Sequence, residues 1–319
     1  MGRSHHPRRG SMQFWPRKRA KTNLARIRSW KIENKPKILG FIAYKAMMSH
    51  LIVLDNRPKS LTKGEKISLP TTVVDCPPMI IGGISFYKKT ESGLKKVKSI
   101  FAEKLDKSLS KKLSLPKKNI KAHEYNHDFD DLRILAYSKP PKAVGTKKPK
   151  MLEFALGGNK ESKLSYAKEI LGKEVQVMDV FEDGTTIDIH GITKGKGFQG
   201  TVKRYGVPIR HHKSEKTKRG IGTLGPWTPK RVAYTVPQPG KMGFHLRTEY
   251  NKQIIKVGAE GKSISPAGGI HGYGMVDNHY MIIKGSIVGP KKRAVVITQA
   301  IRANKKIGKD AFQLIEMIQ

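Results

Sequence analysis

The sequence has very little of three things: cysteine, long apolar runs and acidic residues. Its single cysteine, Cys76, excludes a disulfide within the chain and a zinc site built from cysteines, and it fits a reducing cytoplasm. No apolar run approaches the roughly 20 residues that a membrane-spanning helix needs. No apolar segment follows the basic first 31 residues, which argues against a secretory signal.

Acidic residues are scarce relative to basic ones. The chain has 63 Lys and Arg against 25 Asp and Glu, a formal net charge of +38. Such a charge opposes a compact state unless a polyanion neutralises it, and nucleic acid is the abundant polyanion. A lysine-rich solvated surface would usually balance Lys with Glu, so it explains the lysine count but not the imbalance. The composition therefore predicts binding to RNA or DNA.

The charge is also unevenly distributed. Residues 1–32 hold ten Lys and Arg and no acid, residues 194–231 hold eleven and one acid, and residues 278–309 hold no acid. Residues 91–193, by contrast, carry 15 of the 25 acids beside 20 Lys and Arg, as an ordinary globular surface would. We expect the acid-poor segments to lie on phosphates.

The first acid-free segment, residues 1–31, has aromatic side chains among its cations. Phe14, Trp15 and Trp30 are too few and too irregular to bury one face of a helix or strand. We expect this segment to have no stable structure alone and to become ordered on RNA, where aromatic side chains stack on bases. A solvated tail is the alternative.

Short runs rich in Val, Ile and Thr, separated by Gly and Pro, predict β-strands. Their spacing predicts a small antiparallel barrel built from residues 37–90 and 173–301. The runs are Ile38–Met48, Leu51–Leu54, Ile67–Val74, Met79–Tyr87, Glu174–Ile192, Gly243–Val257, Tyr280–Val288 and Ala294–Ile301.

Residues 91–172 have a different pattern, which predicts an α/β insertion. Apolar residues recur at helical spacing over Ser99–Leu113 and over Asn159–Leu171. The second helix has an N-cap candidate in its first residue or in Ser162. Leu132–Tyr137 is predicted to be a strand.

Residues 194–242 are rich in Gly and Pro and have no sustained period, which indicates a long functional loop. Gly195–Gly200 matches the G-x-G-x-x-G pattern of dinucleotide sites. Such a site needs a following helix, and Gly206 and Pro208 stop one early. We therefore expect these glycines to allow close approach of another backbone, not to bind a nucleotide.

Other motifs also lack the spacing that their chemistry requires. Gly258–Ser263 has too few residues between its glycines for a phosphate loop and predicts a turn. The adjacent pairs His5-His6 and His211-His212 have no third metal ligand at a useful spacing. No G-x-S-x-G motif marks a nucleophile. We expect no catalytic site, no cofactor and no bound metal.

One region closely resembles the signature of a known family, the third protein of the large ribosomal subunit. The matching segments, in order, are TKGKGFQG at Thr193–Gly200, KRYG at Lys203–Gly206, TKRG at Thr217–Gly220, GPWTP at Gly225–Pro229, GKMG at Gly240–Gly243 and RTEYN at Arg247–Asn251. Residues 1–19 resemble the basic N-terminal extension of the archaeal and eukaryotic branch. The resemblance covers nearly the whole chain.

The resemblance implies a mainly β fold, a translation-protein type antiparallel β-barrel with an α/β insertion, a basic N-terminal extension (1–36), a long central loop (194–242) and a C-terminal tail (302–319). It implies a non-enzymatic constituent of the cytoplasmic ribosome that binds large-subunit rRNA, supports early assembly and contacts neighbouring ribosomal proteins. The loop would run toward the peptidyl transferase centre with Trp227 near its tip. Eukaryotic members carry a histidine before the tip, where this chain has Lys218.

The loop residues agree with that implication. No acid occurs between Lys216 and Arg231, and Pro226 and Pro229 stiffen the backbone around Trp227, which can stack on a base. The main alternative is an RNA-binding factor that visits the ribosome without staying bound. The candidate rRNA-binding residues are Arg8, Arg9, Trp15, Arg17, Lys18, Arg19, Lys194, Lys196, Phe198, Lys203, Arg204, Arg210, His211, His212, Lys218, Arg219, Trp227, Lys230, Arg231 and Arg247.

Overall fold

The computed structural model describes residues 7–115, 128–214, 216–304, 308 and 311–318. The chain divides into two compact units. Unit 1 comprises Met1–Thr22 and Ile192–Leu246, and unit 2 comprises Asn23–Gly191 and Arg247–Gln319. Both units are therefore made from two separate stretches of chain. In the described part of the chain, no helix is long and apolar enough to cross a membrane.

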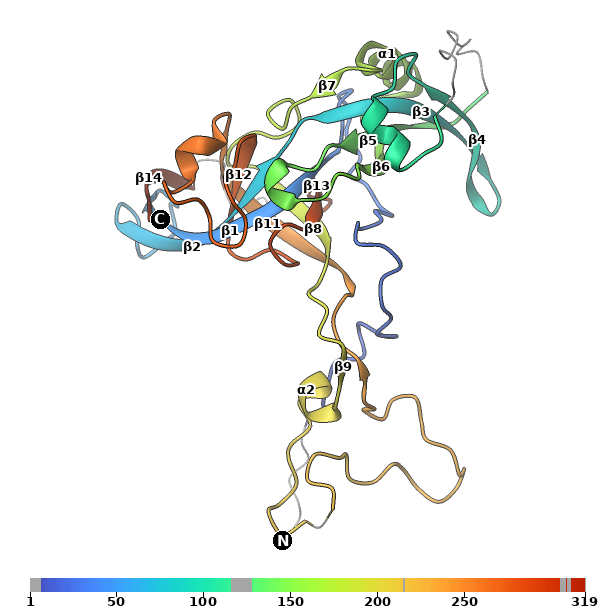
Figure 1. The fold of residues 1–319 in the computed structure, drawn as a ribbon, viewed down its shortest axis with the longest axis vertical. Helices are drawn as coiled ribbons and strands as arrows, with labels where there is room; N and C mark the ends of the chain where they lie inside the picture. The colour runs from blue at the N-terminus through green and yellow to red at the C-terminus, as the bar shows by residue number, and fades with distance from the viewer. Residues whose placement is uncertain (1–6, 116–127, 215, 305–307, 309–310, 319) are drawn as a thin grey trace. The chain divides into compact units, whose positions relative to one another are not determined.

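Most of the regular structure is β, as predicted, and it is concentrated in unit 2 (Figure 1). The larger sheet has seven strands in the order β13-β8-β11-β12-β2-β1-β14, and β13 also pairs with β1. Its strands are β1 (Gly40–Asp55), β2 (Lys66–Cys76), β8 (Thr186–Ile192), β11 (Leu246–Gly258), β12 (His279–Lys284), β13 (Ala294–Gln299) and β14 (Phe312–Ile318).

Strand β1 is long because it has three partners. It pairs with β2 along most of its length, with β13 over Gly40–Tyr44 and with β14 over His50–Asp55. Its first eight residues are all buried, so the run Ile38–Met48 is apolar without the alternation of a half-exposed strand. A β-bulge between Lys45 and Met47 shifts the register with β2.

The smaller sheet has five strands. β4 (Gly93–Phe101), β3 (Met79–Thr90), β5 (Asp131–Ser138) and β6 (Lys150–Ala155) pair in that order, and β7 (Glu174–Val175) also pairs with β3. The strand predicted at Leu132–Tyr137 is confirmed by β5. The expected boundary between residues 90 and 91 falls inside the β3–β4 hairpin, where Thr90 lies opposite Gly93.

The helix expected over Ser99–Leu113 is wrong. Its first residues belong to β4, where Ile100 lies opposite Ile84 of β3, and only Lys107–Lys111 form a short 3-10 helix (η1). Pairing with β3 satisfies the backbone of this segment, and such long-range pairing overrides a local apolar spacing.

The second predicted helix is confirmed as α1 (Lys160–Ile170). Asn159 occupies the N-cap position, and Ser162 Oγ donates to the Asn159 carbonyl over 3.0 Å. Ala167 and Ile170 are its buried residues, and Gly172 beyond its end has a φ of +81°. Two further 3-10 turns are η2 (Lys142–Val144) and η3 (Gly261–Ile264). The turn predicted at Gly258–Ser263 is thus confirmed.

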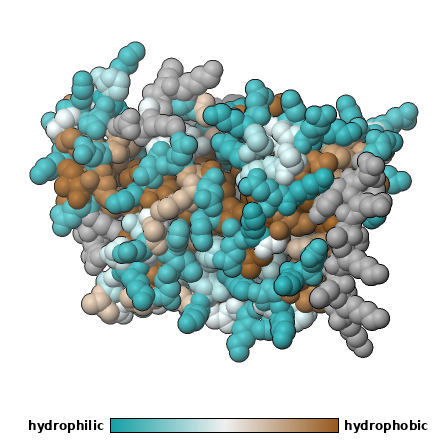
Figure 2. All heavy atoms as spheres, turned by 90° about the horizontal axis from the view of Figure 1, so that it is seen from above, coloured by the Kyte–Doolittle hydropathy of each residue, from teal (hydrophilic) through white to brown (hydrophobic). Residues whose placement is uncertain are grey.

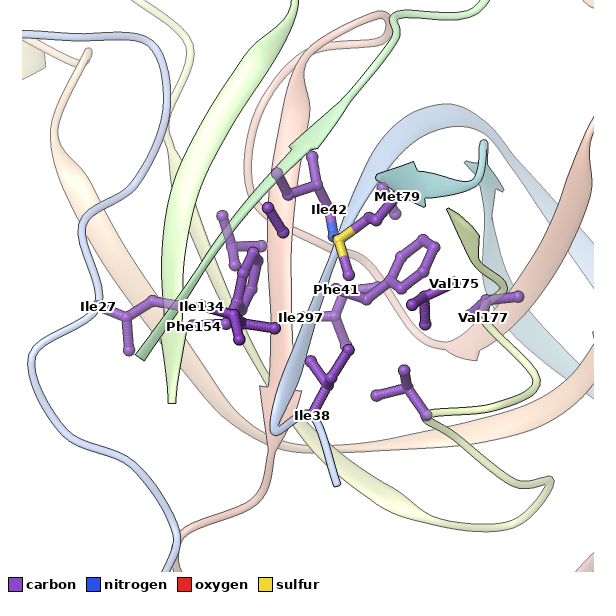
Figure 3. Packing of buried hydrophobic residues seen from close by; sticks show 14 of the residues in the cluster. Ile27, Ile38, Phe41, Ile42, Met79, Ile134, Phe154, Val175, Val177 and Ile297 are labelled. Atoms are coloured by element: carbon purple, nitrogen blue, oxygen red, sulfur yellow. The ribbon is translucent and has the colours of Figure 1, made fainter. Parts of the chain in front are cut away.

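Two hydrophobic clusters form the core of unit 2. The larger one joins the two sheets and contains Phe41 of β1, Ile297 of β13, Met79 of β3 and Phe154 of β6. The Phe41 ring points toward Met79 and Val175 (Figure 3). Burying an aromatic or large aliphatic side chain stabilises a fold by about 1.5–3 kcal/mol. Figure 2 shows hydrophilic side chains over much of one face, with hydrophobic residues visible between them.

Candidate nucleic-acid interface

Unit 1 is nearly free of acidic residues. It holds 19 of the 63 Lys and Arg, and its one acid, Glu215, lies outside the described residues. Both large hydrophobic clusters belong to unit 2. Unit 1 has little regular structure: β9 (Phe198–Gln199), α2 (Thr201–Tyr205) and β10 (Gly240–Lys241), with β9 paired to β10. Its shape is therefore held mainly by hydrogen bonds and ring contacts.

The two ends of the long loop are fastened to each other. The backbone N–H of Thr193 donates to the His245 carbonyl over 3.0 Å, and Met242 donates to the Gly197 carbonyl over 2.8 Å. Gly243 has a φ of +76°, and a Cβ there would lie 2.0 Å from the carbonyl oxygen of Lys194. Only glycine fits this position.

The close backbone approach expected of the G-x-G-x-x-G glycines is thus made mainly by Gly243. Gly197 and Gly200 have no other atoms within 4 Å of an added Cβ, although the φ of +68° at Gly197 still favours glycine. The helix that follows, α2, has five residues and ends at Gly206, whose N–H donates to the Val202 carbonyl. The predicted early stop is confirmed, and this geometry does not match a dinucleotide site.

The N-terminal arm, residues 7–22, has a partner in its own chain. Arg17 donates to the Arg204 carbonyl over 2.8 Å, and its guanidinium lies 4.2 Å from the centroid of the Tyr205 ring. Arg8 donates to the Thr235 carbonyl. From the sequence we expected this arm to contact RNA alone, but the structure shows it packed on the loop. The sequence gives no local signal for these contacts, because they join residues about 190 to 230 positions apart.

His245 is buried and forms hydrogen bonds with both the arm and the end of the loop. Its Nδ1 lies 2.8 Å from the Lys18 carbonyl, and its Nε2 accepts from the Gly243 N–H over 3.2 Å. A carbonyl only accepts, so Nδ1 carries the proton. The adjacent Phe244 carbonyl accepts from the Ala20 N–H. Sequence reasoning missed this residue, whose only signal was its place at the end of the glycine-rich segment.

The three tryptophans have different surroundings. Trp15 is half-buried, with its ring 6.1 Å from that of Tyr205 and 6.0 Å from that of Tyr234. Trp30 belongs to unit 2 and packs edge-on against Phe154, so it is part of the core margin. Trp227 is 83% exposed.

The segment around Trp227 presents the indole to solvent. The Lys230 N–H closes a turn on the Trp227 carbonyl over 2.9 Å, and the ammonium of the same lysine lies 5.6 Å from the indole. Arg210 braces the preceding segment by donating to the Ile221 carbonyl over 2.7 Å and to Thr217 Oγ1 over 3.2 Å. An exposed indole beside the Lys230 ammonium can stack on a base.

Most of the predicted rRNA-binding residues are exposed, and all but Arg247, which lies in β11 of unit 2, belong to unit 1. The half-buried residues are Trp15, Arg17, Arg204, Arg210 and Arg247. The exposed ones are Arg8, Arg9, Lys18, Arg19, Lys194, Lys196, Phe198, Lys203, His211, His212, Lys218, Arg219, Trp227, Lys230 and Arg231. Tyr234, which is 76% exposed, was missed, although it is an aromatic residue close to Arg231 in an acid-free segment.

The histidine pairs give no sign of a metal site. The rings of His211 and His212 lie 4.0 Å apart, and no cluster of three potential ligands occurs among the residues with a described placement. His5 and His6 lie outside that set.

Comparison with known proteins identifies the family. The family model described as "Ribosomal protein L3" matches residues 1–316. The chain belongs to the ribosomal protein L3 family. Proteins named large ribosomal subunit protein uL3 are similar over nearly their full length. That of Methanococcus maripaludis strain C7 is 44% identical, covering 98% of this chain and 95% of the relative. That of Archaeoglobus fulgidus is 44% identical, covering 94% of this chain and 93% of the relative. That of Methanocaldococcus jannaschii is 42% identical, covering 95% of this chain and 93% of the relative. The resemblance read from the sequence, including its archaeal character, is confirmed.

As a member of the L3 family, the chain is a structural ribosomal protein and not an enzyme. The segments that carried the resemblance are those that build unit 1, apart from the RTEYN segment at the start of β11.

Proposed function

We propose that this chain is a structural constituent of the large ribosomal subunit and that unit 1 is its main rRNA-binding element. The main support is that unit 1 has 19 Lys and Arg and a single acid, and that most of those cations are exposed. Its neighbours would be large-subunit rRNA and other ribosomal proteins of the cytoplasmic particle, and its early binding would support assembly.

The larger sheet would hold the two ends of the long loop. Its strands β13, β8, β11, β12, β2 and β1 are paired in sequence, and β1 also pairs with β13. We infer from this ring of pairings a closed barrel of the translation-protein type, with β14 added beside β1. The long loop leaves the strand β8 and returns at β11, so neighbouring strands hold both its ends.

The loop would reach toward the peptidyl transferase centre, with Trp227 as a positioning residue. Support comes from the exposed indole, the adjacent Lys230 and the acid-free segment around them. Since RNA performs the chemistry there, Trp227 would stabilise one arrangement of nearby bases through stacking. Basic residues 1–36 would form an extension along RNA, partly in contact with the loop.

The salt dependence of binding tests the electrostatic part of the proposal. With about ten phosphates neutralised, the affinity of the full chain for large-subunit rRNA should fall with a log–log slope near −7 or steeper. A nearly flat response would contradict phosphate-dominated binding. Salt-resistant co-sedimentation with the subunit would separate a permanent constituent from a visiting factor, which high salt should release.

Particles carrying Trp227→Ala test the loop tip. The lost stacking should cost about 1–3 kcal/mol locally, enough to change the balance of RNA conformations tenfold or more. Subunit yield should stay near the wild-type level, while peptidyl transfer or chemical probing of nearby RNA should change. Arg219→Ala should act similarly with a stronger salt dependence. Unchanged RNA reactivity in the Trp227→Ala particles would remove the positioning role.

A further inference from the structure

Unit 2 contains a cavity of about 660 Å³ on its five-stranded sheet. Four cations line it: Arg26 and Arg28 from the segment before β1, Lys112 after η1, and Arg133 on β5. Among the lining residues with a described placement, Glu153 on β6 is the one acid. The balanced composition of residues 91–193 gives no hint of this concentration, because two of the cations come from the acid-free N-terminal stretch.

Glu153 offsets part of the charge of Arg133, but its hydrogen bonds go to other groups. Tyr87 donates to one carboxylate oxygen over 2.6 Å and Lys96 to the other over 3.0 Å. Burial raises the pKa of Glu153, but these hydrogen bonds and the charges of Lys96 and Arg133 outweigh it and leave the pKa below its ordinary value. The carboxylate therefore stays ionised and committed to Tyr87 and Lys96.

Among the described residues, Lys112 donates to the Met151 carbonyl at 3.5 Å, and Arg133 has one distant acidic neighbour. Asp131 Oδ2 lies 3.8 Å from Arg133 Nε, and the other oxygen of the same carboxylate, Oδ1, pairs with Lys163 at 2.9 Å. Within the described residues, neither Arg26 nor Arg28 forms an ion pair. An unneutralised group of this kind favours an anion.

Lysines around the cavity repel one another. Burial and the charges of Lys150 and Lys148 lower the pKa of Lys112, and burial and the charge of Lys148 lower the pKa of Lys150. A bound anion would relieve this repulsion.

Apolar side chains and the Tyr87 ring form much of the remaining lining. Leu94, Leu135, Met151 and Leu152 line it, and the Arg133 guanidinium lies 4.9 Å from the centroid of the Tyr87 ring. A phosphate beside a flat apolar base needs this combination of cations and apolar wall. The volume falls in the range of roughly 300–1,000 Å³ that small-ligand pockets occupy.

An acidic peptide is the competing occupant of the cavity. Extended peptides gain affinity by adding a strand to an open sheet edge. The central strand β5 is paired on both sides, but the edge strands β4 and β6 also contribute to the lining, through Leu94 and through Met151–Glu153. A peptide added to one of these edges is therefore the competing outcome that the crosslinking below separates from RNA.

We propose that this cavity binds one unpaired nucleotide of ribosomal RNA, with its phosphate at Arg26, Arg28 and Lys112 and its base against the apolar wall. The proposal rests on the proposed function, since it needs RNA as the partner. It adds an RNA-binding site in unit 2 to the interface proposed for unit 1. The residues of the new site are separate in sequence from the loop and the arm of unit 1.

Site-directed photo-crosslinking tests the site. Benzoylphenylalanine replaces Leu94, which is 44% exposed, in the full chain, and the chain is bound to a transcript of large-subunit rRNA and irradiated. The matched control places the same group at Leu61, which is fully exposed on another part of unit 2. We expect a crosslink to one unpaired nucleotide from position 94 and none that is site-specific from position 61. In assembled subunits, a crosslink from position 94 to a ribosomal protein would overturn the proposal in favour of a peptide.

Charge removal gives an independent measurement. The double variant Arg26→Ala and Arg28→Ala should lower affinity for the same transcript about tenfold and reduce the log–log salt slope by about 1 to 2. The control Lys59→Ala and Lys63→Ala removes equal charge from exposed positions and should change affinity less than about twofold. Equal losses in both pairs would overturn the site. Failure of the wild-type chain to bind the transcript would instead overturn the proposed function and this site with it.

Discussion

The two units of this protein keep their structure in different ways. Unit 2 has two hydrophobic clusters and 24 of the 25 acids, while unit 1 has neither cluster and one acid. In unit 1, the buried hydrophobic residues among those described are Ile192 and Tyr205. Hydrophobic burial can thus stabilise unit 2 in water, whereas unit 1 depends on hydrogen bonds to backbone carbonyls and on cation–ring contacts. RNA would supply what unit 1 lacks, a neutralising charge.

The largest effect should come from the core of unit 2. Phe154 is fully buried between the sheets, so Phe154→Ala should reduce the free energy of unfolding by about 3–5 kcal/mol. Urea unfolding followed through the protected amides of unit 2 measures this. The control Leu61→Ala, at a fully exposed position, should change it by less than about 0.5 kcal/mol. Similar losses in the two variants would mean that the clusters do not carry the stability.

The next effect is a pH dependence confined to unit 2. Asp75 is buried; burial raises its pKa to about 6, although Tyr273 and Asn278 donate to it over 2.8 and 3.0 Å. Because the folded-state pKa lies above the unfolded value of about 3.9, the folded chain binds the proton more tightly. The contribution of Asp75 to stability is therefore largest at low pH and falls by about 2–3 kcal/mol as the pH rises from about 4 to 6.

Comparison with Asp75→Asn isolates this effect from the other carboxyl groups. Asp55, for example, titrates in the opposite sense, because hydrogen bonds from Arg57, Ser60 and Thr62 hold its pKa far below the ordinary value. The stability difference between wild type and Asp75→Asn should shift by about 2–3 kcal/mol between pH 4 and pH 7. A constant difference across this range would show that Asp75 titrates normally.

A smaller effect should appear where the arm meets the loop in unit 1. Tyr205→Ala removes the ring that contacts both Arg17 and Trp15, which should weaken arm docking by about 1–2 kcal/mol. Hydrogen exchange of residues 7–20 in the free protein should accelerate, while the amides of unit 2 stay protected. Phe198→Ala, an exposed ring in the same unit, serves as the control. Unchanged exchange in the Tyr205→Ala chain would show that the ring contacts do not hold the arm.

The smallest effect on stability should be that of Trp227→Ala. The side chain is 83% exposed, so its removal should change the free energy of unfolding by less than about 0.5 kcal/mol. Calorimetry of the free protein checks this. A loss of several kcal/mol would make Trp227 a buried residue in solution and would end its role in RNA binding.

The sequence predicted most strands of the larger sheet because short β-branched runs between Gly and Pro are a local signal, but it missed β4, β6 and β14. It did not predict which strands pair. β3 lies in the first block of strand-forming runs but pairs with β4, β5 and β7, and β14 came from a segment read as a tail. Pairing depends on contacts between distant residues, as in His50 opposite Ile318, and no local pattern encodes them.

For the candidate interface, the structure gives the exposure of the predicted residues and their contacts within the chain. Charge and aromatic patterning identified residues such as Arg219 and Trp227, which are exposed. The same pattern could not separate them from Arg17 and Arg210, whose guanidinium groups donate to carbonyls of unit 1 itself. An arginine that braces a loop and one that faces solvent look alike in a sequence, because the difference lies in the position of a distant backbone oxygen.

The three partners of β1 have a consequence for the order in which the chain can fold during synthesis. β1 is made before the long loop, but His50–Asp55 pair with β14 and Gly40–Tyr44 pair with β13, and both of these strands are made after the loop. The basic loop is translated before either strand exists. A growing chain therefore offers its cations to RNA while half of β1 is still an open edge, and contacts so distant in sequence form slowly. Binding to nascent rRNA can then precede completion of the sheet.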